Sequence, residues 1–242
     1  MKSCYFVNWI INTFLFFSAF LFLGTSAHAD PWTGKGELGY VQVSGNTESE
    51  TLNAGIRLEK IHDKWKHVAK ASAIRAAEDD EASSESYGAS WRSEYSLSAR
   101  SFTFGDIRYF DDKFDSFEEI YTISAGFGYK VFNREGLTWD LSAGIGYRDT
   151  AIESTQEDIS SITYILESDY KQQLTESTTL ENNTRAEIAH DNSFIQNVLG
   201  ISISINSSLA LKVSYDVRHN TQPEPGDVST DKIFSTNIVY SF

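Results

Sequence analysis

The chain has 242 residues, a formal net charge of −14 and an aromatic content of 14%. That aromatic content is too high for a disordered acidic chain. The excess of carboxylates argues against nucleic acid as a partner, because phosphate binding needs clustered lysine and arginine. The length fits one closed all-β domain, so the open question in the composition is where the excess negative charge lies.

The N-terminal residues have the order of an export signal. An uncharged run over 5–23 follows Lys2, and small residues stand at positions −3 and −1 before Asp30. This order predicts a cleaved secretory signal peptide over residues 1–29 and a β-barrel domain over 30–242. An uncleaved membrane anchor is the alternative.

Cysteine usage and hydropathy narrow the class further. Cys4 is the single cysteine and lies in the predicted signal, so the mature chain is expected to have no disulfide, thiol nucleophile or cysteine-bound metal. Beyond the signal no apolar run reaches 18 residues, which excludes a transmembrane helix there. An exported chain of this kind can still enter a membrane as a β-barrel.

Apolar and polar residues alternate with period two along most of the remaining chain. Near the end, Phe234, Ile238 and Tyr240 share one face, and serine and asparagine occupy the other. Such alternation predicts strands with one apolar and one polar face. The predicted strands are 33–44, 49–61, 65–77, 86–97, 101–110, 118–132, 137–149, 159–173, 177–189, 194–205, 208–219 and 232–242.

The connections between these strands alternate in length. The short ones are 62–64, 98–100, 133–136, 174–176 and 206–207, and the mostly longer ones are 45–48, 78–85, 111–117, 150–158, 190–193 and 220–231. Twelve antiparallel strands with this pattern are typical of an outer-membrane barrel, with both termini at the short-turn, periplasmic end. A soluble β-sandwich also alternates, but its surface strands rarely carry six outward apolar side chains.

One predicted strand departs from the pattern. Phe102 and Phe104 share a parity with Asp106 and Arg108, so apolar and charged residues would lie on the same face. The sequence therefore predicts a β-bulge or a register error in the fifth strand.

The polar face of the strands is rich in charge of both signs, which suits a barrel lumen. The candidate lumen-lining residues are Arg57, Glu59, Arg92, Glu94, Asp140, Arg148, Glu167, Asp169, Lys171, Arg185, Glu187, Lys212, Asp216 and Arg218. Opposite charges can pair across the interior and fill it, or they can line a narrow pore. A barrel of about eight strands is filled and one of sixteen or more leaves a channel, so twelve strands leave both interpretations open.

Most of the net charge lies in four loop regions. Segments 78–85, 111–119, 149–158 and 220–231 hold 17 acids and one base, a net charge of −16, which leaves +2 for the rest of the chain. The candidate acidic loop residues are Glu78, Asp79, Asp80, Glu81, Asp111, Asp112 and Asp115. They have no EF-hand spacing, so we assign no metal ligands. A solvated loop, a cation-attracting mouth and contact with cation-bridged lipopolysaccharide are the alternatives.

The start of the predicted mature chain resembles a known family. Trp32, a glycine-spaced first strand and the turn Ser44-Gly45-Asn46-Thr47 are similar to the YdiY-like family of outer-membrane proteins, a family of unknown function described as salt-induced. The likeness covers 30–242 in pattern. It implies an outer-membrane β-barrel of Gram-negative type and a link to salt or osmotic stress. It brings no catalytic, cofactor or ligand residues.

Catalytic patterns are weak in this sequence. The nearest cluster is His190-Asp191-Asn192-Ser193, whose members are ordinary turn residues and point in different directions. We therefore predict a non-enzymatic protein without a cofactor, and a lipid hydrolase using His190 and Ser193 is the minor alternative. His219 is predicted to be a loop-edge residue.

The leading functional hypothesis is a small, cation-preferring outer-membrane channel or envelope protein. A non-conducting structural or surface-interaction barrel is the second hypothesis. The expected partners are outer-membrane lipid, lipopolysaccharide, divalent cations at the outer loops and the barrel-assembly machinery, which would recognise the terminal aromatic Phe242. The transported solute and the oligomeric state are not encoded in any motif.

Overall fold

All twelve predicted strands are present in the computed structural model, which describes residues 31–43, 49–78, 81–112, 117–152, 157–223 and 229–242. The strands are β1 Thr33–Val43, β2 Ser49–His62, β3 Trp65–Glu78, β4 Glu81–Ser96, β5 Ser101–Asp112, β6 Phe117–Arg134, β7 Leu137–Ile152, β8 Glu157–Gln173, β9 Thr178–Ile188, β10 Phe194–Ser204, β11 Leu209–Asn220 and β12 Thr230–Ser241.

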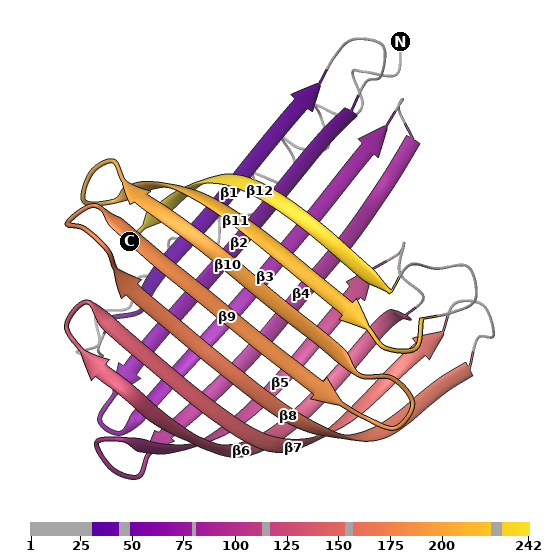
Figure 1. Cartoon of the computed structure of the whole chain (residues 1–242), viewed down its shortest axis with the longest axis horizontal. Coiled ribbons are helices and arrows are strands. Elements are labelled where there is room, and N and C mark those ends of the chain that lie inside the picture. Colours follow the sequence, from indigo (N-terminus) through magenta and orange to yellow (C-terminus); the bar gives the residue numbers. More distant parts are fainter. Residues whose placement is uncertain (1–30, 44–48, 79–80, 113–116, 153–156, 224–228) are drawn as a thin grey trace. The chain divides into compact units, whose positions relative to one another are not determined.

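The strands form one closed antiparallel barrel. Each strand pairs with its neighbours in sequence, and β1 pairs with β12 to close the sheet. Figure 1 shows the wall of β8–β11 in front of the wall of β1–β4, with short turns gathered at one end. We call this the short-turn end, and the opposite end, where β9 joins β10 and β11 joins β12, the long-loop end.

The outer face of the barrel is apolar and exposed. Phe127 on β6 and Phe234 on β12 are 70% and 69% exposed, and many isoleucine, leucine and tyrosine side chains share this face. The inner face instead buries polar residues such as Asp106, Arg148 and Glu187. A soluble protein has the opposite arrangement, whereas a membrane barrel places apolar side chains against lipid. No helix in the described ranges is long and apolar enough to cross a membrane.

The strands extend further toward the long-loop end than predicted. The expected loop 78–85 is mostly strand, because β4 begins at Glu81, and the expected loop 111–117 loses residues to both β5 and β6. These extensions are polar, so an apolar period of two could not find them, although the backbone hydrogen-bond ladder continues through them.

The predicted bulge in the fifth strand is wrong. The β5 registers with β4 and β6 run without a shift, and Phe102 and Phe104 simply point inward, where both are buried. Space for them comes from inward-facing glycines: a Cβ on Gly128 would lie 2.0 Å from the Phe102 ring, and a Cβ on Gly126 would lie 2.8 Å from the Phe104 ring.

Register shifts occur elsewhere. One separates Lys130 from Phe132 in the β6–β7 ladder, so Phe132, rather than Val131, pairs with Trp139 on the outer face. Another lies between Ala76 and Ala77 in the β3–β4 ladder. A bulge of this kind inserts one residue and re-aims the side chains beyond it.

Candidate functional site

All fourteen candidate lumen residues lie at inward positions of their strands. They alternate with exposed outer side chains, and several bond to residues on strands that are not their neighbours, which is possible only across the interior. That these residues line a conducting path stays a prediction.

The acidic candidates are placed differently from the expectation. Asp111 lies within β5, where Tyr109 donates a hydrogen bond from its hydroxyl to the Asp111 carboxylate at 3.2 Å. Glu78, Glu81 and Asp112 belong to strand ends, so their assignment to loops is wrong. Their side chains, and the residues Asp79, Asp80 and Asp115 altogether, lie outside what the structure describes.

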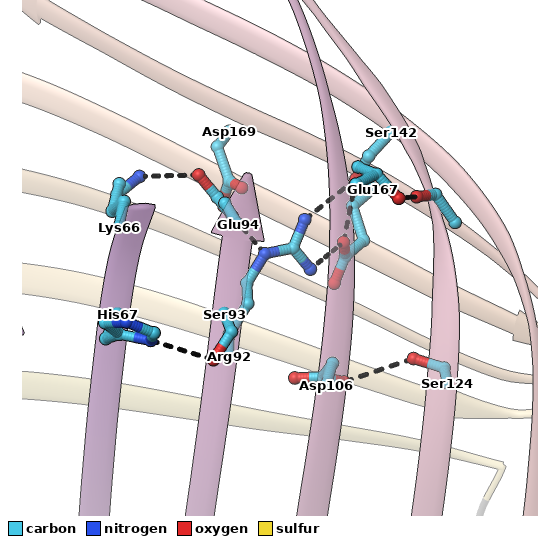
Figure 2. Close-up of polar contacts among 12 residues, drawn as sticks. Lys66, His67, Arg92, Ser93, Glu94, Asp106, Ser124, Ser142, Glu167 and Asp169 are labelled. Carbon is cyan, nitrogen blue, oxygen red and sulfur yellow. Dashed lines mark hydrogen bonds and ion pairs between the residues drawn. The ribbon is translucent and has the colours of Figure 1, made fainter. Parts of the chain in front are cut away.

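Two strands that are four apart in the barrel are joined through Arg92 of β4. Its guanidinium Nη1 donates to Glu167 of β8 at 2.8 Å, and its Nε donates to Glu94 at 2.8 Å. Lys66 adds a second cation to Glu94 at 3.2 Å, and Ser142 of β7 donates to Glu167 at 2.8 Å. Figure 2 shows these side chains meeting inside the barrel.

A second arginine, Arg185 of β9, extends the same set of ion pairs. It contacts Glu187 at 2.7 Å, Asp106 of β5 at 3.2 Å and also Glu167, and its side chain is only 10% exposed. Arg108 of β5 donates to Glu187 at 3.3 Å. Charges taken out of water are stable only when they are paired, and this arrangement gives each of them a partner of opposite charge. Nη2 of Arg185 meets Asp106 as an ion pair without a hydrogen bond.

We call this set the lumen network. It consists of Lys66, Arg92, Arg108, Arg185, Glu94, Asp106, Glu167 and Glu187, and its four cations balance its four anions. It connects β3, β4 and β5 to β8 and β9. The network therefore fills this side of the interior and carries no net charge.

One phenylalanine packs against the lumen network, and a second is buried on the same face of β5. The Arg92 guanidinium lies 3.9 Å from the centroid of the Phe104 ring, a cation–π distance, and Phe102 is 2% exposed. Sequence reasoning missed these residues as part of the interior, and it also missed Lys66, Asp106 and Arg108. For the β5 residues the available signal was their spacing. Phe102 and Phe104 stand an even number of residues from Asp106, so all three side chains lie on the same face of the strand.

The interior along β1, β2 and β11 is paired more locally, and its Arg57 is more exposed than any member of the lumen network. Lys212 of β11 donates to both carboxylate oxygens of Glu37 on β1, at 2.8 and 3.0 Å. Arg57 pairs with Glu59 on its own strand at 2.7 Å, and its side chain is 39% exposed. Glu37 is 26% exposed. Outside this wall, Lys171 near the short-turn end of β8 pairs with Glu181 and is 50% exposed. Water thus reaches charged side chains on the β1, β2 and β11 wall.

The connection between β9 and β10 is tied to the inner wall at the long-loop end. Arg148 of β7, 2% exposed, donates from Nη2 to the Asn192 carbonyl at 2.5 Å and to the Asp191 carboxylate at 3.2 Å. Burial alone would raise the pKa of Asp191, but a hydrogen bond from its own backbone N–H and the Arg148 charge together hold that pKa below the usual range. The connection is therefore held by a charged, hydrogen-bonded anchor.

A small cavity of about 30 Å³ lies beneath this connection. Its lining includes Arg108, Arg148, Glu187 and Arg218, with Phe110 and Phe194 supplying apolar surface. The volume is enough for one or two water molecules.

The residues of the weak catalytic candidate make structural bonds. The Ser193 hydroxyl donates to the Ala189 carbonyl at 3.3 Å, and Asn192 donates to Asn220 at 2.9 Å. His219, expected at a loop edge, lies within β11 and bonds Thr230 of β12 at 2.8 Å. In the part of the chain that the structure describes, no three His, Cys, Asp or Glu side chains gather as a metal site would require.

An apolar outer face, a closed antiparallel wall and a charged interior define an outer-membrane-type β-barrel. Residues 36–242 match the family described as "Protein of unknown function, DUF481", and the chain belongs to this family. It is 26% identical over 212 residues to "Uncharacterized protein YdiY" of Escherichia coli (strain K12), which covers 87% of this chain and 83% of that protein. The resemblance to the YdiY-like family is thereby confirmed.

Two solved structures are similar to this chain at low sequence identity. The COG4313 outer membrane channel from Pseudomonas putida F1 is 10% identical, with 91% of this chain and 100% of that chain covered and a TM-score of 0.52. The KdgM porin in complex with disordered oligogalacturonate is 11% identical, with 87% and 99% covered and a TM-score of 0.43. At these identities the likeness concerns the fold alone.

Proposed function

We propose that this protein is a narrow channel in the outer membrane of a Gram-negative bacterium, and that its conducting path follows the β1, β2 and β11 wall. The observation that carries the proposal is the unequal exposure of charged side chains inside the barrel. Arg57 on β2 and Glu37 on β1 are 39% and 26% exposed, whereas Arg185 and Glu187 in the lumen network are 10% and 4% exposed. Small hydrated ions would pass beside the network rather than through it.

A preference for cations is the second part of the proposal. The lumen network is charge-balanced, so the network itself does not select a sign. Four segments predicted to lie mainly at one end of the barrel carry a net charge of −16 in the sequence. A ring of carboxylates raises the local cation concentration and disfavours anions. The same carboxylates would bind divalent cations that bridge to lipopolysaccharide, and a role in salt or osmotic stress rests on the family resemblance.

Planar-bilayer recording tests both parts. Purified, refolded protein should give small single-channel currents in KCl, and a tenfold KCl gradient should give a reversal potential of the cation-selective sign. A variant with Glu78→Gln, Asp79→Asn, Asp80→Asn and Glu81→Gln should keep the conductance and lose part of the selectivity. Folded protein without conductance would end the channel proposal.

The lumen network favours a second candidate, a closed structural barrel. Bonds from β4 to β8 and from β5 to β9 can span the interior and block it. If the barrel is closed, the wild type should be silent in the bilayer and the double variant Arg92→Ala, Arg185→Ala should conduct. If the channel proposal holds, the wild type should conduct and the double variant should give larger currents.

A further inference from the structure

The seam that closes the barrel is much shorter than the strands that form it. β1 and β12 pair over four residue pairs within the strands, from Lys35–Ser241 to Leu38–Ile238, and Gly34–Phe242 adds one more at the short-turn end. β1 pairs with β2 along its whole length, from Thr33 to Val43, and β12 pairs with β11 from Thr230 to Tyr240. Toward the long-loop end, both strands therefore continue without pairing to each other. Figure 1 shows β1 and β12 diverging beyond their common segment.

The hydrogen-bond pattern identifies which main-chain groups face this unpaired part of the seam. Gly34 and Phe242 exchange both of their bonds, at 2.8 and 3.0 Å, whereas the Ser241 N–H donates to Ser208 next to β11. In an antiparallel ladder every second residue points its N–H and C=O to the same neighbour. The N–H and C=O of Phe234 and Thr236 on β12 therefore point toward β1, and no β1–β12 pair forms at those two residues.

The transition from the paired to the unpaired part of the seam is built from specific side chains. Gly39 of β1 is buried, and a Cβ there would lie 2.2 Å from Oδ1 of Asn237 and 2.5 Å from the Thr236 carbonyl oxygen, so only glycine lets this part of β12 come so close. That Oδ1 is buried and has no hydrogen-bond partner. On the short-turn side of Asn237, Lys212 of β11 donates across β12 to Glu37 of β1 and stabilises the paired half of the seam. The seam is therefore paired near the short-turn end and unpaired toward the long-loop end.

The unpaired part of β12, which we call the free edge, can bind another strand through its main-chain groups. Lipid tails cannot satisfy a main-chain N–H or C=O, and leaving such groups unpaired in a membrane costs several kcal/mol each. An extended polypeptide supplies donors and acceptors at the required spacing, as in β-strand addition. We propose that the long-loop half of the β1–β12 seam is a docking edge that accepts an extended polypeptide segment as an additional strand against β12.

The neighbouring side chains restrict which segment fits. Phe234 is 69% exposed on the outer face, whereas Ser235 and Asn237 face the interior beside Ser214 and Lys212. A docked strand therefore needs apolar residues outside alternating with small polar residues inside. The acidic segments predicted near this end disfavour an acidic partner, so the segment is neutral or basic.

The test probe is a synthetic peptide based on residues 39–46, which would face β12 from Asn237 to Thr230 if the register of the paired part continued. The changes Val41→Ser, Gln42→Leu and Val43→Ser give it the required alternation. Fluorescence anisotropy with labelled peptide and the full-length protein in lipid nanodiscs should show saturable binding. N-methylation at peptide positions 40 and 42 removes the two N–H donors that would face Thr236 and Phe234 of β12. This change should weaken binding at least about tenfold, since two main-chain hydrogen bonds to β12 would be lost.

A locked seam provides the matched comparison. The double variant Tyr40→Cys, Thr236→Cys would form a disulfide across the free part of the seam, and reduction would reopen it. The control Ser214→Cys, Ser235→Cys joins β12 to β11, an existing pair, and leaves the free edge open. Peptide binding should be lost in the oxidised locked variant, return on reduction, and persist in the control.

Three results would overturn the proposal: no saturable peptide binding, equal binding of the N-methylated peptide, or unchanged binding in the locked protein. If the locking disulfide does not form, Phe234→Pro removes a donor from the free edge and must reduce binding by itself. A concentration-dependent dimer that the peptide dissociates would identify a second copy of this chain as the occupant, which also supports a strand-accepting edge.

Discussion

Replacing Arg185 by glutamine removes the cation that three carboxylates share inside the barrel. Arg185 contacts Asp106, Glu167 and Glu187, and those carboxylate side chains are 5%, 11% and 4% exposed. Breaking a buried ion pair by removing one partner typically costs about 3–5 kcal/mol, because the remaining charge stays desolvated. Arg92 and Arg108 still neutralise part of that charge, so we expect Arg185→Gln to lower the free energy of unfolding by about 3 kcal/mol.

The matched control is Lys171→Gln. Lys171 pairs with Glu181 at 3.0 Å, but its side chain is 50% exposed, so its loss should cost under about 1 kcal/mol. Urea unfolding in lipid vesicles, followed by tryptophan fluorescence, gives both differences if the denaturant slope is unchanged. Equal effects of the two substitutions would show that burial of the lumen network does not determine its energetic contribution. Adding Glu187→Gln to Arg185→Gln should then recover part of the loss, since the pair is coupled.

Three further predictions concern the anchor, the glycine pocket and the outer face. Because the folded-state pKa of Asp191 is lowered, its ion pair stabilises the fold above the ordinary carboxyl pKa of about 3.9 and is lost as the pH falls through the lower folded value. Asp191→Asn should therefore destabilise slightly at pH 7 in equilibrium unfolding, and its difference from the wild type should shrink as the pH falls below the ordinary carboxyl pKa. Gly128→Ala should push Phe102 from its site and cost about 1–3 kcal/mol in the same assay, and Phe102→Ala in the same chain should relieve part of that strain. Phe127→Arg should cost about 2–4 kcal/mol in vesicles if this exposed residue meets the lipid core, and no change would place it outside the membrane.

The sequence predicted the strands well because alternation along a strand depends only on the chain itself. Successive side chains point to opposite faces whatever the neighbouring strands do, so the parity of Arg92, Glu167 and Lys212 could be read directly. Strand ends were predicted less well. Polar residues such as Glu81 and Asp112 continue the hydrogen-bond ladder without any apolar signal.

The irregular positions needed the neighbouring strands. Phe102 and Phe104 looked like a fault in β5, because two aromatic residues shared a face with charges. The fault disappears once β6 is aligned beside β5, since inward glycines on β6 leave room for both rings. A bulge in β6 could not be read from its own alternation for the same reason: it is defined by its register with β7.

The sequence by itself determined that twelve strands with one apolar and one charged face form a membrane-type barrel, and it determined which charges face inward. The tertiary structure decided which of those charges meet. Arg92 reaches Glu167 and Arg185 reaches Asp106 because the curvature of the sheet and the stagger of its strands bring together strands that are four apart in the barrel. The alternation of apolar and polar residues along a strand encodes neither quantity. The unpaired half of the seam was likewise decided only in three dimensions, because the pairing of β1 with β12 depends on how the whole sheet closes.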